Sequence, residues 1–238
     1  MKLIKSLHKW LSVLVALQLL VWLGSGLFFN LMDHSKARGN EYRIGLTEPV
    51  AVEHERLLEP SALLKLPTKN VNSIKQIQLL GQPYYLLNHN RGLYAHFYNE
   101  YTLINAYTGA LKVIDDVMAK KLAQQTYGGN GSISSSEKIS PPFDDFPKEK
   151  NAVWQINFDD ELYTSVYIDA SSGRLVGHSN EDKRFADFFF MLHFMDYGTV
   201  GSFNNWQIIF FALLTLLFCI TGFIWTMELL IKGRYKIR

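Results

Sequence analysis

The sequence is poor in cysteine, and the one that it has, Cys219, lies inside a long apolar run. The polar remainder of the chain therefore has no cysteine pair to bridge, so a domain formed there must be held together by its core alone. A dominant charge is lacking as well, since 24 Lys and Arg stand against 22 Asp and Glu. A chain this close to neutrality gives no reason to expect a nucleic-acid partner.

The motifs of common catalytic sites are also missing. The sequence contains no glycine-rich dinucleotide fingerprint, no phosphate-binding loop, no G-x-S-x-G turn and no H-E-x-x-H pair. His54, His89, His96 and His178 are scattered, without a second ligand at the spacing of a metal site. The sequence therefore names no catalytic or metal-binding residue, and it favours a protein that is not an enzyme by itself.

Two long apolar runs dominate what is present. Residues 10–32 and residues 206–227 carry no charged side chain. A helix rises about 1.5 Å per residue, so each run is long enough to cross a hydrocarbon core of about 30 Å. The sequence predicts two transmembrane helices, with the whole middle of the chain on one side of the bilayer.

Basic residues at both ends predict the orientation, because Lys and Arg next to a span resist translocation. They are Lys2, Lys5, Lys9, Lys232, Arg234, Lys236 and Arg238. Both termini are therefore expected in the cytoplasm. The first run exceeds the roughly 7–15 apolar residues of a signal peptide and has no A-x-A site after it, so we expect an uncleaved signal anchor. The style of the sequence suggests a bacterial inner membrane with a periplasmic central domain, and a eukaryotic membrane is the alternative.

The middle of the chain predicts short elements separated by turns. Residues 33–52 are mostly polar and are predicted to be a linker. Residues 53–66 predict a short helix that Pro60 interrupts. Strands are expected at residues 74–80, 84–88, 93–99, 101–106, 153–158 and 162–169. A helix is expected at residues 114–127, and residues 130–149, rich in Gly, Ser, Pro and Asp, are expected to form a long exposed loop.

One short pattern occurs twice. NAYTGAL, which begins at Asn105, recurs as DASSGRL, which begins at Asp169, and each copy follows a predicted strand. The pattern predicts a tight turn, in which the first side chain accepts hydrogen bonds from the turn backbone and the glycine takes a positive φ. The predicted turn residues are Asn105, Gly109, Asp169 and Gly173.

The recurrence predicts a central domain of two repeats, residues 53–113 and 114–180, each a helix followed by an antiparallel meander. The expected fold is α+β, with two transmembrane helices flanking this exported domain. Residues 1–32 are the cytoplasmic flank and first transmembrane helix, residues 181–202 an interfacial aromatic helix, and residues 203–238 the second transmembrane helix and basic tail.

Short motifs at the ends of the two runs resemble those of one family. They are His8-Lys9-Trp10, Ser25-Gly26-Leu27, Leu192-His193-Phe194 and Thr221-Gly222-Phe223-Ile224-Trp225. Their order, together with the repeated strand–turn–strand unit, resembles the PepSY domain and the PepSY-associated transmembrane family, of which this chain looks like a short two-span member. Some larger members are haem-containing reductases of iron complexes or flavoprotein fusions. The resemblance implies a redox or iron-uptake setting, in which this chain depends on partners for reductase chemistry.

The resemblance makes His193, His8 and His34 the candidate ligands of a b-type haem. On the expected topology His8 is cytoplasmic and His193 is external, so they cannot bind one haem together. A second copy of the chain or a partner subunit would supply each second ligand, and His34 is an alternative mate for His193. The structural alternative makes His8 an interfacial residue beside Trp10 and leaves His193 half-buried in an interfacial helix.

Two further features bear on contacts in the membrane. Residues 184–197 contain five Phe and one Tyr, too few residues to span and too apolar for free solvation, which predicts an interfacial helix. Its aromatic stripe is expected to serve lipid and core packing, with a cofactor face as the alternative. Residues 24–26 and Thr221-Gly222 are small residues expected at different depths, so they predict contacts to other subunits, as does the mid-span amide of Gln18, with simple helix flexibility as the alternative.

Three functions fit these features. The first is a membrane-anchored accessory subunit of a redox or iron-uptake system, with lipid and either a second copy or a partner subunit as its contacts. The second is a subunit that carries electrons through haem b within an oligomer. The third is a regulator of an extracellular protease, which would need an open sheet edge for a peptide.

The basic flanks predict the outcome of a topology experiment. Alkaline phosphatase folds to its active form only outside the cytoplasm, so a phosphatase fused after Arg238 should be inactive. A fluorescent protein at the same site should fluoresce. An active phosphatase at this position would overturn the predicted orientation.

Overall fold

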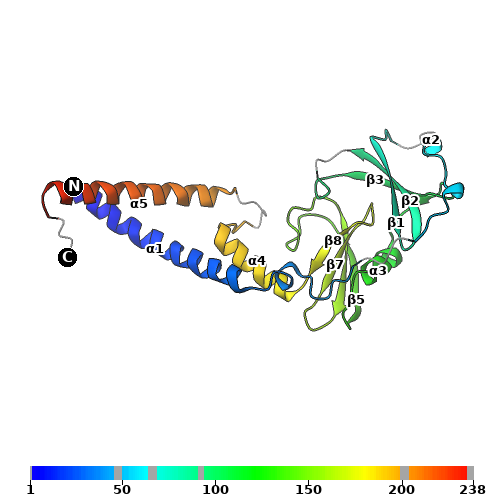
Figure 1. The fold of residues 1–238 in the computed structure, drawn as a ribbon, viewed down its shortest axis with the longest axis horizontal. Coiled ribbons are helices and arrows are strands. Elements are labelled where there is room, and N and C mark those ends of the chain that lie inside the picture. The colour runs from blue at the N-terminus through cyan, green and yellow to red at the C-terminus, as the bar shows by residue number, and fades with distance from the viewer. Residues whose placement is uncertain (1, 46–49, 64–68, 91–93, 199–203, 235–238) are drawn as a thin grey trace. The chain divides into compact units, whose positions relative to one another are not determined.

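The computed structural model describes residues 2–45, 50–63, 69–90, 94–198 and 204–234. These residues form two compact units (Figure 1). The helical unit combines residues 1–32 with residues 187–238, and the sheet unit comprises residues 33–186. The predicted α+β fold, with an apolar helix on each side of a central domain, is confirmed.

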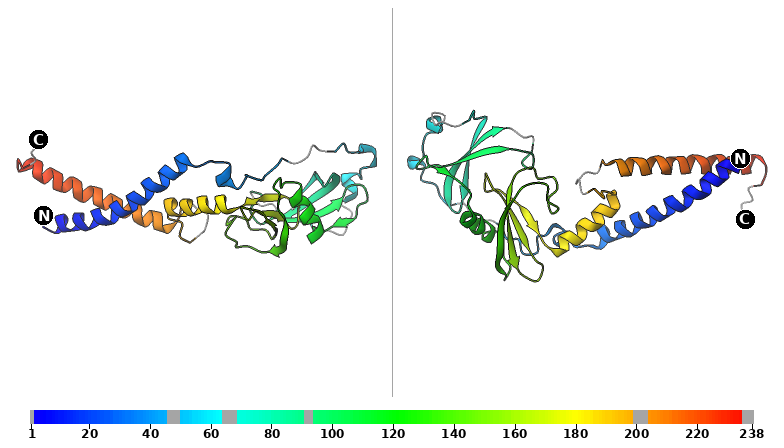
Figure 2. Two further views of the ribbon diagram at one scale, coloured as in Figure 1. Left: turned by 90° about the horizontal axis from the view of Figure 1, so that it is seen from below. Right: turned by 180° about the vertical axis from the view of Figure 1, so that it is seen from behind.

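Three helices contribute to the helical unit. They are α1 (Lys2–Leu31), the C-terminal part of α4 (Glu181–Phe194) and α5 (Trp206–Ile231). Both α1 and α5 are long and apolar enough to cross a membrane, and most of their large apolar side chains are exposed. The two helices run antiparallel (Figure 2) and share a small core around Val15, Phe211 and Met195. An outer surface of exposed apolar side chains is suited to contact with lipid.

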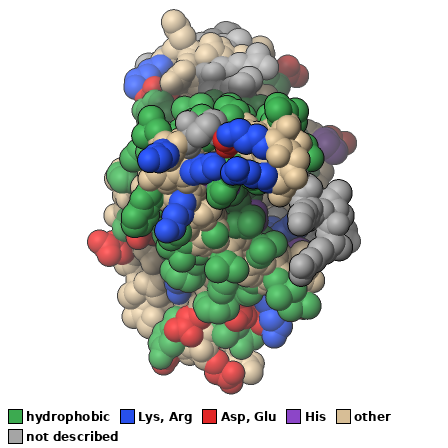
Figure 3. Space-filling model, turned by 90° about the vertical axis from the view of Figure 1, so that its left-hand side faces the viewer, with side chains coloured by type: hydrophobic (Ala, Val, Ile, Leu, Met, Phe, Trp, Pro, Cys, Tyr) green, Lys and Arg blue, Asp and Glu red, His purple; other side chains and the backbone are tan. Residues whose placement is uncertain are grey.

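Charged and aromatic side chains mark the ends of this unit. Lys and Arg gather where α1 begins and α5 ends (Figure 3). Lys5 forms an ion pair with Glu228 there, with 3.5 Å between Nζ and Oε2. Trp10 and Trp206 are 70% and 72% exposed. Exposed tryptophans of this kind are typical of the boundary between hydrocarbon and water.

The sheet unit consists of two antiparallel meanders joined by one helix. The strands of the first sheet are β1 (Ser73–Leu79), β2 (Gln82–Asn90), β3 (Glu100–Asn105) and β4 (Leu111–Lys112), in that order. Those of the second are β5 (Ser132–Ile139), β6 (Val153–Asp159), β7 (Ser165–Asp169) and β8 (Leu175–Ser179), also in chain order. Helix α3 (Asp116–Gln124) lies between them in the chain, and the side chain of Asp115 accepts a hydrogen bond from Met118 N at its start.

The repeated pattern forms the same turn in both sheets. Asn105 Oδ1 accepts hydrogen bonds from the next backbone amides, of Tyr107 and Thr108, and Asp169 Oδ1 does the same in the second sheet. Gly109 has a φ of +73° and Gly173 a φ of +72°. A β-carbon at positive φ is strained against the backbone, so each turn favours glycine.

The two sheets share one core. Tyr84 and Leu103 of the first sheet belong to the same buried cluster as Leu122 of α3 and Ile156 and Val166 of the second sheet. A smaller cluster covers the opposite face of the first sheet and includes Leu63, Tyr85, Leu87, Ile104 and Ala106. With no disulfide available, this apolar burial must stabilise the unit.

Several predicted elements differ from the structure. The helix predicted at residues 53–66 is a 3₁₀ turn, η2 (His54–Arg56), and a short helix, α2 (Pro60–Leu63), before residues outside the described ones. Pro60 begins α2 and does not interrupt it, because a first helical position needs no donor. In the strand predicted at residues 93–99, the described part forms turns and irregular structure.

The loop predicted at residues 130–149 contains strand β5, so this prediction is wrong for its first half. The strand has β6 as its only ladder partner among the described strands, and its Ser, Glu and Lys side chains are mostly exposed. An edge strand of this kind shows little apolar alternation. The linker predicted at residues 33–52 includes η1 (Lys36–Arg38), and its Ile44 amide donates to the Thr126 carbonyl.

The turn geometry predicts the cost of one substitution. A β-carbon on Gly173 would lie 2.9 Å from Leu79 Cδ1 and at positive φ, so Gly173→Val should lower the free energy of unfolding by about 1 kcal/mol or more. Gly45, whose added β-carbon has no heavy atom within 4 Å, provides the control variant Gly45→Val. Thermal unfolding of the full-length protein in detergent measures both. Equal melting temperatures for the two variants would contradict the assigned turn.

Candidate functional site

His8 is held between α1 and α5 by one hydrogen bond and two rings. Its Nδ1 lies 3.1 Å from Thr221 Oγ1. The imidazole stacks on Phe218, with 4.6 Å between ring centroids and 8° between planes, and meets the edge of Trp225 at 5.6 Å. This fixes the ring in position and in orientation.

His193 is held in a parallel way between α4 and α1. Its Nδ1 lies 2.9 Å from Ser25 Oγ. The ring of Phe29 meets it edge-on at 5.3 Å. Beside this contact, Phe189 of α4 stacks on Phe28 of α1 with centroids 3.9 Å apart. The aromatic stripe of α4 therefore packs at least partly against α1.

The small residues of the two spans make room for these histidines. A β-carbon on Gly222 would lie 2.8 Å from His8 Cε1, and one on Gly26 would lie 3.8 Å from His193 Cε1. Ser25, Gly26, Thr221 and Gly222 thus contact histidines of their own chain, and the predicted contacts to other subunits stay a prediction. Gly24 differs, since a β-carbon there meets no heavy atom within 4 Å.

The hydroxyl partners set the tautomer of both rings. Thr221 donates its hydroxyl proton to Phe218 O at 2.9 Å, and Ser25 donates to Val21 O at 2.7 Å. Hydroxyls bonded back to their own helix have no proton left for the imidazole, so each oxygen accepts from an Nδ1–H. In the neutral ring, Nε2 is then the nitrogen without a proton. No hydrogen-bond partner of either Nε2 occurs among the residues that the structure describes.

The two histidines lie far apart along the helical unit. His8 and Ser25, the partner of His193, are 17 positions apart on α1, which is about 25 Å at 1.5 Å per residue. A single haem or metal ion therefore cannot contact both rings of one chain. No group of three or more His, Cys, Asp or Glu suited to a metal ion occurs among the described residues.

The remaining histidines belong to the sheet unit. His34 follows α1, and its side chain is exposed, without a hydrogen bond to another described residue. His89 bonds to Asn70 O and Thr102 Oγ1 and so ties strands together. His178 is buried against Thr126 at 2.9 Å, and this burial, with the charge of Arg43, lowers the pKa of His178 to about 4. A structural role suits both His89 and His178, and the lowered pKa favours the neutral form of His178.

The geometry fits one half of a haem site at each end of the helical unit. Haem iron takes an unprotonated imidazole nitrogen as axial ligand, and a hydrogen bond at the other nitrogen orients such a ring. His8 and His193 both meet these conditions. The helical unit contains no third histidine, so a second imidazole must come from outside it.

Sequence reasoning named the histidines but missed their hydroxyl partners. The predicted topology could have paired them, because it assigns each residue a depth in the membrane. His8 and Thr221-Gly222 fall on the cytoplasmic side, and His193 and Ser25-Gly26 fall on the external side. Each histidine thus shares a depth with one pair of small residues, and the structure brings these partners together.

These features define a membrane protein with a two-helix anchor and a two-sheet domain between its helices. The chain belongs to the PepSY-associated transmembrane family, because the family described as PepSY-associated TM region matches residues 2–228. No curated protein and no solved structure matched the chain in the corresponding comparisons.

The contact between His8 and Gly222 predicts that a side chain added at position 222 lowers stability more than one added at position 24. Gly222→Val should destabilise the helix pair by roughly 1–3 kcal/mol, because the new side chain overlaps the imidazole. Gly24→Val, in the same kind of apolar helix with open space, should change stability little. Thermal unfolding of the full-length protein in one detergent compares them. A Gly222→Val variant as stable as Gly24→Val would show that His8 does not lie against α5.

Proposed function

We propose that the protein is a membrane-anchored accessory subunit of a redox or iron-uptake system and is not an enzyme by itself. Its setting is a bacterial inner membrane, with both termini in the cytoplasm and the sheet unit in the periplasm. The basic flanks support this orientation, because Lys and Arg next to a span resist translocation. The family match and the two candidate spans support the anchor itself.

One observation carries the proposal of a subunit. His8 and His193 are each fixed at Nδ1, while neither Nε2 has a partner among the described residues. A bare polar nitrogen is costly in hydrocarbon, so a group from another molecule is expected to satisfy it. Two such nitrogens, one towards each membrane surface, suit a chain that completes its sites within a larger assembly.

A second candidate function follows from the same geometry. The tautomer and the fixed rings suit axial ligation of a b-type haem, which would supply a one-electron redox couple when bound. His193 would hold an external haem and His8 a cytoplasmic one. The second ligands would be the same residues of a second copy, histidines of a partner subunit or, on the external side, His34. The protein would then be an electron-transfer subunit acting as an oligomer.

If the protein carries electrons through haem, the haem lost in a histidine variant depends on which histidine is replaced. His193→Ala should remove the external haem, because it deletes the nitrogen that binds iron, and His8→Ala should remove the cytoplasmic one. His54→Ala, at an exposed position of η2, is the control and should keep both. The protein is purified with its co-expressed neighbours from haem-replete cells, and a pyridine haemochrome assay measures haem per chain. A parallel loss in His34→Ala would identify His34 as the mate of His193.

The same purification separates the two candidates. Colourless wild-type protein that retains a partner subunit would refute haem transfer and support the accessory role. Colourless protein without any partner, and with unchanged stability in both histidine variants, would refute both candidates. Circular dichroism of each variant shows that a loss of haem is not a loss of fold.

A further inference from the structure

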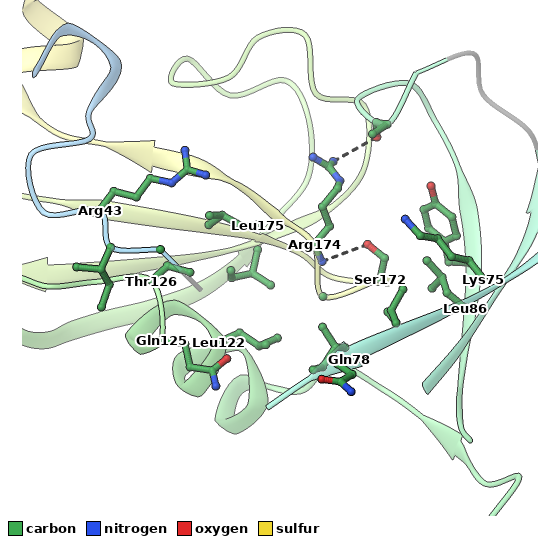
Figure 4. A pocket seen from close by; sticks show the side chains of 18 of the residues that line it. Arg43, Lys75, Gln78, Leu86, Leu122, Gln125, Thr126, Ser172, Arg174 and Leu175 are labelled. Atoms are coloured by element: carbon green, nitrogen blue, oxygen red, sulfur yellow. Dashed lines mark hydrogen bonds between the residues drawn. The ribbon is translucent and has the colours of Figure 1, made fainter. Parts of the chain in front are cut away.

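The sheet unit contains a cavity of about 940 Å³ that is open to solvent on one side (Figure 4). It lies against the inner face of the first sheet, the end of α3 and the turn before β8, all within one compact unit. Cavities that hold small organic molecules commonly measure about 300–1,000 Å³. The volume is therefore sufficient for a molecule of that size.

The walls of the cavity combine apolar and polar groups. Leu86 of β2, Leu122 of α3 and Leu175 of β8 provide apolar surface from three elements (Figure 4). Gln78 and Gln125 line it with amide groups; that of Gln78 bonds to the backbone of Val50, and that of Gln125 can both donate and accept hydrogen bonds. Apolar walls with a few polar groups are typical of sites for organic ligands.

The charge of the cavity has one sign. Arg43, Lys75 and Arg174 line it, and no Asp or Glu does so among the described residues. Arg174 is already neutralised by Glu149, at 2.6 Å. Arg43 Nη1 lies 3.4 Å from Oδ1 of the neutral Asn40, and the exposed Lys75 has no ion-pair partner in the described part of the chain. Two cations are therefore available to an incoming anion.

Buried polar contacts brace the cavity on the side of Arg174. Glu149 is 2% exposed and accepts hydrogen bonds from Arg174 and from Asn151 Nδ2, at 2.6 and 2.7 Å. Asn151 also donates to Phe97 O at 2.8 Å, which joins the second sheet to the loop that leads into β3. These bonds join the loop before β6 to the loop before β3 without a ligand. A preformed cavity lowers the ordering cost of binding.

We propose that this cavity is a binding site for an organic anion with an apolar body and an acidic group at each end, one held by Arg43 and the other by Lys75, which lie on opposite sides of the cavity (Figure 4), while the leucines line its apolar part. A carboxylate, sulfonate or phosphate suits either cation, because each offers several acceptor oxygens. The apolar walls disfavour inorganic ions, which have no surface to bury there. The sheet unit is then a receptor for a small molecule, independently of any haem in the helical unit.

Fluorescence anisotropy of fluorescein, a rigid aromatic dianion, tests the assignment with the full-length protein in phosphatidylcholine nanodiscs. Wild-type protein should bind the dye saturably above empty nanodiscs, whereas rhodamine 123, a cation with the same ring system, should not bind. Lys75→Glu and Arg43→Glu should each weaken fluorescein binding by about tenfold or more, as the loss of a charge-assisted hydrogen bond implies. Lys138→Glu, on the exposed side of β5, is the matched control and should leave binding unchanged.

Three results would overturn the proposal. They are absence of saturable fluorescein binding to the wild type, equal binding by the Arg43→Glu/Lys75→Glu double variant, and equal binding of the cationic dye. Both altered side chains are exposed, so the variants should fold, and their melting temperatures verify this. Competition by octanoate against fluorescein, but not by inorganic phosphate, would support the need for an apolar body.

Discussion

Hydrocarbon offers no water to a polar side chain, and this constraint organises the helical unit. Each imidazole in it finds a partner for its Nδ1 at a hydroxyl that is bonded back to its own helix. These two contacts determine which residues of α1 face α5 and which face α4. Gly222, next to Thr221, allows the ring of His8 to approach α5. The apolar remainder of the helices is then free to face lipid.

The sheet unit is also stabilised by contacts within the protein, but these contacts are of another kind. It lies outside the spans and has no cysteine, so its two meanders are stabilised by a common apolar core and by the buried carboxylate of Glu149. The second repeated turn serves both purposes. Asp169 closes the hairpin, and Arg174, five residues later, connects that hairpin to the loop before β3. A short turn motif thus also positions one wall of the cavity.

Much of this architecture is readable from the sequence, and the misses have physical causes. The two apolar runs and the repeated turn are local signals, and they predicted both spans and both sheets. Strand β5 was missed because its sequence, SISSSEKI, is mostly polar and exposed, and its conformation depends on pairing with β6. The hydroxyl partners of His8 and His193 escaped because they lie far away in sequence. From the sequence, the pairing of Thr221 with His8 can be predicted only by comparing the membrane depths expected for the two residues.

The shared core makes the duplicated domain behave as one body. Leu103 of the first sheet and Ile156 of the second lie in the same cluster as α3. Removing either half would leave the inner face of the other in water, at a cost that a small sheet cannot bear alone. Ancestry by duplication, which the recurring turn suggests, has therefore not preserved two modules that could be exchanged, shuffled or lost separately. Any evolutionary change in one half must be accommodated by the other.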